Sequence, residues 1–96
     1  MQRRTLGEQN IDTLWSISEL AAVSRAEGNL KHAETLLREA LTGYRKVRGD
    51  DHAETLDTIG ALIDVLRERG ALEEAAALEL ELKKSRQRVA DADKVS

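Results

Sequence analysis

A stretch of this sequence occurs twice, and the repetition constrains the fold more than any other feature. The second copy, Arg48–Leu56, reads R-G-D-D-H-A-E-T-L, and the first, Leu6–Leu14, reads L-G-E-Q-N-I-D-T-L. Aligning residues 6–47 with residues 48–89 gives identities at 13 of 42 positions. Self-similarity at a fixed period is typical of proteins that stack equivalent units. We therefore expect two stacked repeats rather than a domain with one active centre.

The residue types within each repeat favour α-helices. The chain has 96 residues without proline, and strong helix formers dominate it. Gly28 and Gly70 each end the first helix of a repeat, because glycine adopts the left-handed conformation after a helix without a steric penalty. Short connections between long helices require antiparallel hairpins. The expected helices span residues 12–27, 30–47, 53–69 and 72–89, and residues 90–96 are expected to fray.

Apolar residues recur at helical spacing and predict the core. The fourth helix departs from this pattern, because Glu79 and Lys83 occupy the positions of Leu37 and Leu41 in the second helix. The predicted inward-facing residues are Leu14, Ile17, Leu20, Ala21 and Ser24 on the first helix, Leu30, Ala33, Leu36, Leu37, Ala40, Leu41, Tyr44 and Val47 on the second, Leu56, Ile59, Leu62, Ile63 and Leu66 on the third, and Leu72, Ala75 and Leu78 on the fourth.

Local signals predict how the helices begin and pair. Asn10 is a candidate N-cap for the first helix, and Asp51 with Glu54 has the spacing of a capping box for the third. Glu34 and Arg38 are expected to pair on the solvated side of the second helix. Gly43 and Gly60 lie inside helices, where glycine marks either a close helix approach or simple tolerance.

The motifs of both repeats resemble the tetratricopeptide repeat. Each has a turn glycine followed five residues later by alanine, in G28-N-L-K-H-A33 and G70-A-L-E-E-A75, preceded by I17-x-x-L20-A21 and I59-x-x-L62-I63. The period and the run V47-R-G-D-D-H52 are similar to the longer repeats of kinesin light chains. The resemblance implies an all-α fold of two antiparallel helix-turn-helix hairpins, stacked as a short right-handed solenoid within a single domain, residues 1–96, with repeats at about 6–47 and 48–89.

The resemblance also implies a non-catalytic module that binds a protein or peptide on the face lined by the first helix of each hairpin. The residues carried over to that face are Trp15, Ser18, Glu19, Ala22, Arg25, Asp57, Gly60, Ala61, Asp64 and Arg67. The family often has asparagines that hold a peptide backbone where Ser18-Glu19 and Gly60-Ala61 stand here, and Ala53 replaces its proline. Peptide clamping of that kind is therefore not expected.

Two of these residues have alternative interpretations. Arg25 and Arg67 occupy the same place in both repeats and could together bind a carboxylate of an acidic peptide. Alternatively, they are solvated charges that interact favourably with the helix C-termini. Trp15 is either an exposed anchor for a partner or a plug over the end of the hairpin.

Composition and motifs exclude several classes of function. The net charge of −3 argues against a dedicated nucleic-acid binder. No apolar run is long enough to span a membrane, no metal-binding or catalytic motif occurs, and no cofactor is expected. The absence of cysteine fits a cytoplasmic protein.

The small number of repeats points to a second function class. Two stacked repeats leave apolar end faces, which favours homodimerisation or membership of a longer solenoid. Structural self-association is therefore the alternative to a peptide-binding role.

Overall fold

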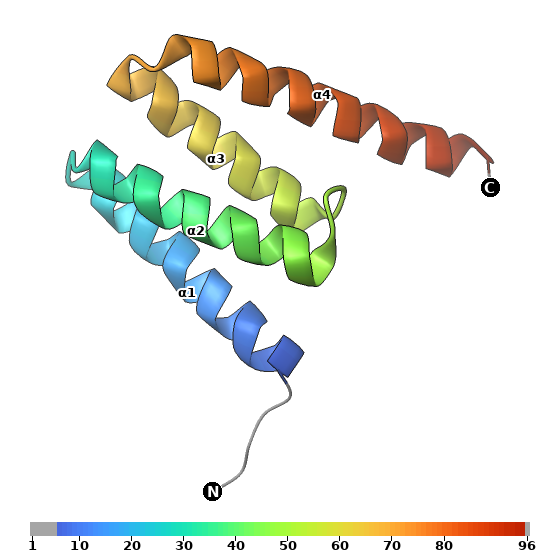
Figure 1. The fold of residues 1–96 in the computed structure, drawn as a ribbon, viewed down its shortest axis with the longest axis horizontal. Helices are drawn as coiled ribbons and strands as arrows, with labels where there is room; N and C mark the ends of the chain where they lie inside the picture. Colours follow the sequence, from blue (N-terminus) through green and yellow to red (C-terminus); the bar gives the residue numbers. More distant parts are fainter. Residues whose placement is uncertain (1–5, 96) are drawn as a thin grey trace, which may run out of the picture.

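Four α-helices follow one another in space in the order of the sequence, so that each packs against the next (Figure 1). The computed structural model describes residues 6–95, with side chains described for residues 11–92. The helices are α1 (Leu6–Ala26), α2 (Leu30–Arg48), α3 (Ala53–Arg69) and α4 (Leu72–Val95). The expected all-α fold of two helix hairpins is confirmed, whereas the right-handed twist of the stack stays a prediction.

The turns within the two hairpins are built alike. Gly28 has φ +84° and donates its N–H to the Arg25 carbonyl, and the next N–H, from Asn29, reaches the Ser24 carbonyl. In the second hairpin Gly70 has φ +90°, and equivalent bonds reach Arg67 and Leu66. These bonds satisfy helix carbonyls that would otherwise lack partners, and the left-handed φ explains the need for glycine.

Both ends of the bundle differ from the prediction. Helix α1 begins at Leu6, so Asn10 lies inside the helix and the predicted N-cap there is wrong. Helix α4 continues to Val95 instead of fraying after residue 89, and Gln87 Nε2 donates to Asp91 Oδ1 in this extension. Neither segment contains proline, which would interrupt a helix. Both helices therefore extend past the apolar residues from which their ends were predicted.

The N-cap of α3 is His52 and not Asp51. His52 Nδ1 accepts the Glu54 N–H at 3.1 Å, while the carboxylate of Asp51 turns to Arg88 on α4, with Oδ1 2.8 Å from Nη2. A guanidinium offers a charge-assisted pair that the backbone N–H cannot match. The sequence spacing identified the turn correctly but assigned the cap to the wrong neighbour.

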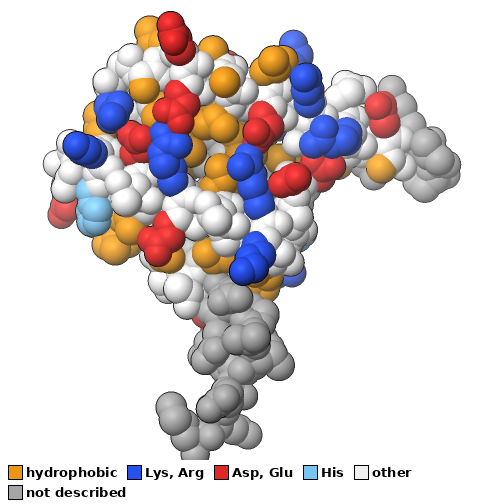
Figure 2. Space-filling model, in the orientation of Figure 1, with side chains coloured by type: hydrophobic (Ala, Val, Ile, Leu, Met, Phe, Trp, Pro, Cys, Tyr) orange, Lys and Arg blue, Asp and Glu red, His pale blue; other side chains and the backbone are white. Residues whose placement is uncertain are grey.

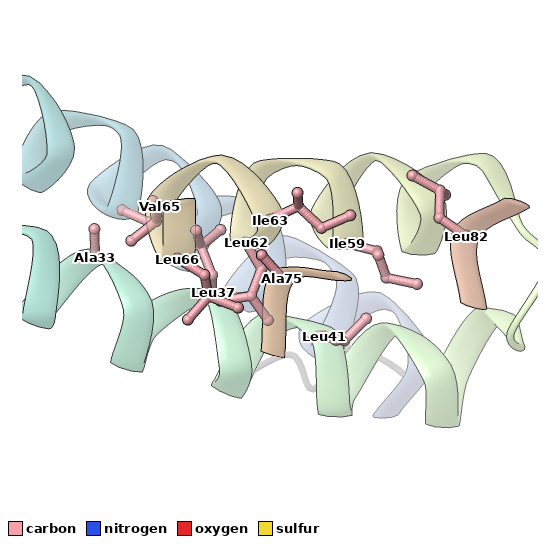
Figure 3. Packing of buried hydrophobic residues seen from close by; sticks show 11 residues of the cluster. Ala33, Leu37, Leu41, Ile59, Leu62, Ile63, Val65, Leu66, Ala75 and Leu82 are labelled. Atoms are coloured by element: carbon pink, nitrogen blue, oxygen red, sulfur yellow. The ribbon is translucent and has the colours of Figure 1, made fainter. Parts of the chain in front are cut away.

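The larger of two core clusters runs through both repeats, with α3 at its centre (Figure 3), and a smaller cluster of Leu14, Ala40 and Tyr44 joins α1 to α2. Most predicted core positions are buried, but Leu20 is half exposed and Leu72 is exposed, so their predicted burial is wrong. The polar positions of α4 lie away from the core, where Glu79 pairs with Arg67, while Ala75, Leu82 and Ser85 are buried. The structure thus gives the fourth helix a different inward face from the second.

Gly43 marks a close approach between α1 and α2. A Cβ at this position would overlap Leu14 Cδ2 and lie 3.1 Å from Leu14 Cγ. At Gly60 a Cβ would meet nothing within 4 Å. Of the two interpretations of helical glycine, close packing therefore applies to Gly43 and simple tolerance to Gly60.

Ion pairs connect the second helix of each repeat across the stack. Arg38 pairs with Glu74 and Arg45 with Glu81, joining α2 to α4, and Figure 2 shows basic and acidic side chains side by side over this part of the surface. Glu34 pairs with Arg38 as expected, but its side chain is only 13% exposed and also contacts Arg69 Nε at 3.0 Å. Glu34 therefore lies between the repeats rather than on the solvated side of α2.

Candidate partner-binding site

A pocket of about 250 Å³ opens between α1, α2 and α3, and we name it the Trp15 pocket. Helix α2 supplies its floor through the buried Leu37 and Tyr44. The remaining lining residues come from the first helices of the two repeats, namely Trp15 and Ser18 on α1 and Glu54, Asp57, Thr58 and Ala61 on α3. Four of the residues predicted for partner binding, Trp15, Ser18, Asp57 and Ala61, are thus brought together around one pocket.

Trp15 is exposed at the rim of this pocket. Its side chain retains 57% of its accessible surface, which excludes the interpretation of a buried plug. Trp15 and Asp57 occupy equivalent positions in the two repeats, so the stacking of α1 beside α3 places an indole near a carboxylate. An exposed indole beside a hollow is a typical anchor in protein interfaces.

The two acidic side chains that line the Trp15 pocket, Glu54 and Asp57, both come from α3. Burial raises the pKa of Tyr44, and the charge of Glu54 raises it further, so the phenol stays neutral at physiological pH. Glu54 is itself paired with Arg48, at 3.0 Å between Oε1 and Nε. Within residues 11–92, by contrast, the Asp57 carboxylate forms no ion pair and lies exposed to solvent. Asp57 therefore carries the free charge of the pocket.

The two arginines predicted to hold a ligand carboxylate are each paired within the chain. Arg25 Nε donates to Glu68 Oε1 at 2.8 Å, with Asp64 4.0 Å away, and Arg67 pairs with Glu79 on α4. The hydrogen bond with Glu68 raises the pKa of Arg25. An acidic ligand would have to displace these carboxylates. The alternative of solvent-facing charges at the helix ends fits their exposure.

The other predicted residues do not line the pocket: Glu19 and Ala22 are exposed on α1, and Asp64 is exposed and Gly60 half-buried on α3. Sequence reasoning missed Leu37, Tyr44, Glu54 and Thr58 as lining residues. Residues 54, 57, 58 and 61 share the i, i+3, i+4 and i+7 spacing of one helical face, so the pattern on α3 carried this information. Leu37 and Tyr44 of α2 line the pocket only because α1 and α3 leave a gap above them. The periodicity of a single helix does not predict such a gap.

A second surface is the side of α1 that faces away from α2, and we name it the α1 outer face. It consists of Thr13, Ser16, Ile17, Leu20 and Val23 and borders a shallow hollow. Leu20 and Val23 are 50% and 52% exposed. Their counterparts in the second repeat, Leu62 and Val65, are 1% and 0% exposed because α2 covers them. The α1 outer face therefore has the composition of a contact between repeats but no repeat against it.

The described residues contain neither a candidate metal site nor a candidate membrane-spanning helix. Within them no three His, Asp or Glu side chains come close enough to hold a metal ion. None of the described helices combines the length and hydrophobicity that crossing a bilayer requires.

Comparison with protein families gives one clear result. The family model for the tetratricopeptide repeat matches residues 12–87, which spans all four helices and both turn glycines. No curated protein matches the chain.

Proposed function

Because the chain belongs to the tetratricopeptide repeat family, whose members generally mediate protein–protein interactions and are typically non-catalytic, we propose that it is a non-catalytic module that binds a peptide or protein partner. We infer from its longer repeats that it is of the kinesin-light-chain type. The absence of cysteine is compatible with a location in the reducing cytoplasm. No cofactor takes part.

The proposed binding surface is the face made by α1 and α3. Its nine residues are Trp15, Ser18, Glu19, Ala22, Arg25, Asp57, Ala61, Asp64 and Arg67. The observation that carries this proposal is the exposed indole of Trp15 at the rim of a pocket with an apolar floor. More than half of this large aromatic side chain is left in water, and such residues contribute heavily to binding when a partner covers them.

A selection of random twelve-residue peptides against the intact chain tests this proposal. Selected peptides should bind wild-type protein and lose at least about tenfold in affinity for the Trp15→Ala variant, since truncation of a hot-spot residue costs about 2 kcal/mol or more. Leu80→Ala is the matched control, because Leu80 is similarly exposed on α4 but lies outside the pocket. Equal losses in both variants, or no selected peptide, would overturn the proposal.

Self-association is a second candidate function, and the α1 outer face supports it. Two copies that pair these faces about a two-fold axis would each cover the other's Leu20 and Val23. Pairing of α1 with α4 of another copy is less favourable, because α4 presents Lys83 and Arg86 where α2 presents Leu41 and Tyr44 to α3. The dimer that we propose is therefore closed, without growth into a filament.

Size-exclusion chromatography with light scattering tests the dimer. Wild-type protein should show twice the chain mass of 10.7 kDa at high concentration, and Leu20→Glu should show the monomer mass. Leu80→Glu should remain dimeric, because it introduces the same charge at an equally exposed leucine on α4. A wild-type monomer at every concentration, or a dimer that Leu80→Glu alone disrupts, would contradict this assignment.

A further inference from the structure

The Trp15 pocket has features that select among ligands. Its floor is apolar, its rim carries one exposed indole, and Asp57 on α3, a carboxylate without a partner among the described residues, lines the same pocket. A ligand group suited to all three features combines an apolar stem with a positively charged end.

The neighbouring charges favour the same sign of ligand. The arginines around this face are already paired, Arg48 with Glu54, Arg25 with Glu68 and Arg67 with Glu79. A ligand carboxylate would meet the unpaired Asp57 without a free guanidinium on the described part of this face to offset it. A ligand cation would gain from Asp57 without breaking an existing pair.

The chemistry of lysine and arginine side chains fits these surroundings. Their methylene stems cover apolar surface while the charged head stays at the rim. A cation over an indole face gains about 0.5–1 kcal/mol at an exposed site, and more once it is desolvated. The guanidinium of arginine also forms a planar pair with a carboxylate.

We propose that the Trp15 pocket binds a lysine or arginine side chain of a partner peptide, with Trp15 contacting the cation and its stem and Asp57 pairing with the charge. This inference rests on the proposed peptide-binding function and names the chemistry of the partner. It replaces the expectation of an acidic ligand with a basic one.

Four synthetic libraries of nine-residue peptides test the inference. The central residue is fixed as Arg, Lys, Leu or Glu, and the other positions are mixtures of Ala, Ser and Leu with blocked termini. Trp15 is the only tryptophan of the chain, so its fluorescence reports on the pocket directly. The Arg and Lys libraries should bind at least about tenfold more tightly than the Glu library and several-fold more tightly than the Leu library.

Two acid-to-amide variants locate the preference. Asp57→Asn should remove most of the discrimination between the Arg and Glu libraries. Glu73→Gln is the matched control, because Glu73 is exposed on α4, outside the pocket and outside the proposed binding surface. It should leave the discrimination unchanged. Circular dichroism verifies that both variants fold.

The outcomes separate this inference from the proposed function. If the Leu or Glu library changes Trp15 fluorescence at concentrations equal to or below those of the Arg library, the pocket binds peptides but the basic preference is refuted. If Asp57→Asn and Glu73→Gln behave alike, the assignment to Asp57 is refuted. If no library changes the fluorescence and random selection also yields nothing, the peptide-binding function itself fails.

Discussion

The α1 outer face and the matching face of α3 carry nearly the same residues in opposite surroundings. Four of the five positions are identical, at Thr13 and Thr55, Ile17 and Ile59, Leu20 and Leu62, and Val23 and Val65, and the fifth pairs Ser16 with Thr58. On α3 these residues are buried, because α2 of the preceding repeat lies against them. On α1 no described helix fills that place, and the same apolar side chains meet solvent.

This difference shows that burial in a repeat stack depends on the neighbouring repeat as much as on the residue. The other end of the stack differs. Helix α4 has Glu79, Lys83 and Arg86 at the positions where α2 has its apolar stripe. A polar outer face is the usual property of a terminal repeat. At the positions equivalent to the apolar stripe of α2, α4 therefore suits solvent, whereas the α1 outer face suits a partner.

The largest predicted effect is the difference in stability lost when Leu62 or Leu20 is truncated to alanine. Leu62→Ala should lower the free energy of unfolding by about 2–5 kcal/mol, because it removes fully buried methyl groups and leaves a cavity. Leu20→Ala should cost less than about 1 kcal/mol in dilute monomeric protein, because half of the side chain is already in water. Urea unfolding at low micromolar concentration measures both. Equal costs would show that the α1 outer face is covered in solution.

Glu34 and Ala76 occupy equivalent positions, of which only the first is covered by a following repeat. Glu34→Ala should lower the free energy of unfolding by about 1–2 kcal/mol, because it removes a largely buried carboxylate that pairs with both Arg38 and Arg69. Glu39→Ala, an exposed change on the same helix, should be nearly neutral. Chemical denaturation of the two variants measures the contrast. A neutral Glu34→Ala would mean that this contact between repeats is weak in solution.

Replacing each helical glycine by alanine should change the stability of the fold, in opposite directions at Gly43 and Gly60. Gly43→Ala should destabilise the chain by about 1 kcal/mol, because the overlap with Leu14 outweighs the helix propensity gained. Gly60→Ala should stabilise it by up to about 1 kcal/mol, since a methyl group meets nothing there. The melting temperatures of both variants, measured by thermal unfolding, test this prediction. Stabilisation by Gly43→Ala would show that α1 and α2 are farther apart than described.

The smallest effect concerns acid stability. Hydrogen bonds from Arg88 lower the pKa of Asp51 in the folded chain. The pair therefore contributes stability above the ordinary aspartate pKa, and this contribution is lost as pH falls through the lowered pKa. Asp51→Asn should flatten the loss of thermal stability between about pH 6 and 2, and Arg88→Gln should flatten it equally. An unchanged pH profile in both variants would show that the pair is absent in solution.

Much of the fold followed from the spacing of residues. The glycines at 28 and 70, the alanines at 33 and 75 and the leucine stripes predicted two hairpins and most of the core. Helix ends were less predictable, because capping is decided by competition among neighbours such as Asp51 and His52, and the winner depends on where Arg88 lies. The candidate site was half predicted, since the faces of α1 and α3 were identified but not their common pocket.

The sequence by itself determined the repeat, the helices and the apolar stripe of the second and third helices, because helical periodicity depends on interactions within about one turn of the chain. The tertiary structure decided which inward faces are covered, which arginines are already neutralised and where an exposed indole meets a free carboxylate. Those properties depend on residues about 40 positions apart, such as Arg25 with Glu68 and Trp15 with Asp57. Equivalent positions such as Leu20 and Leu62 carry the same residue, and only the neighbouring helix makes one of them core and the other surface.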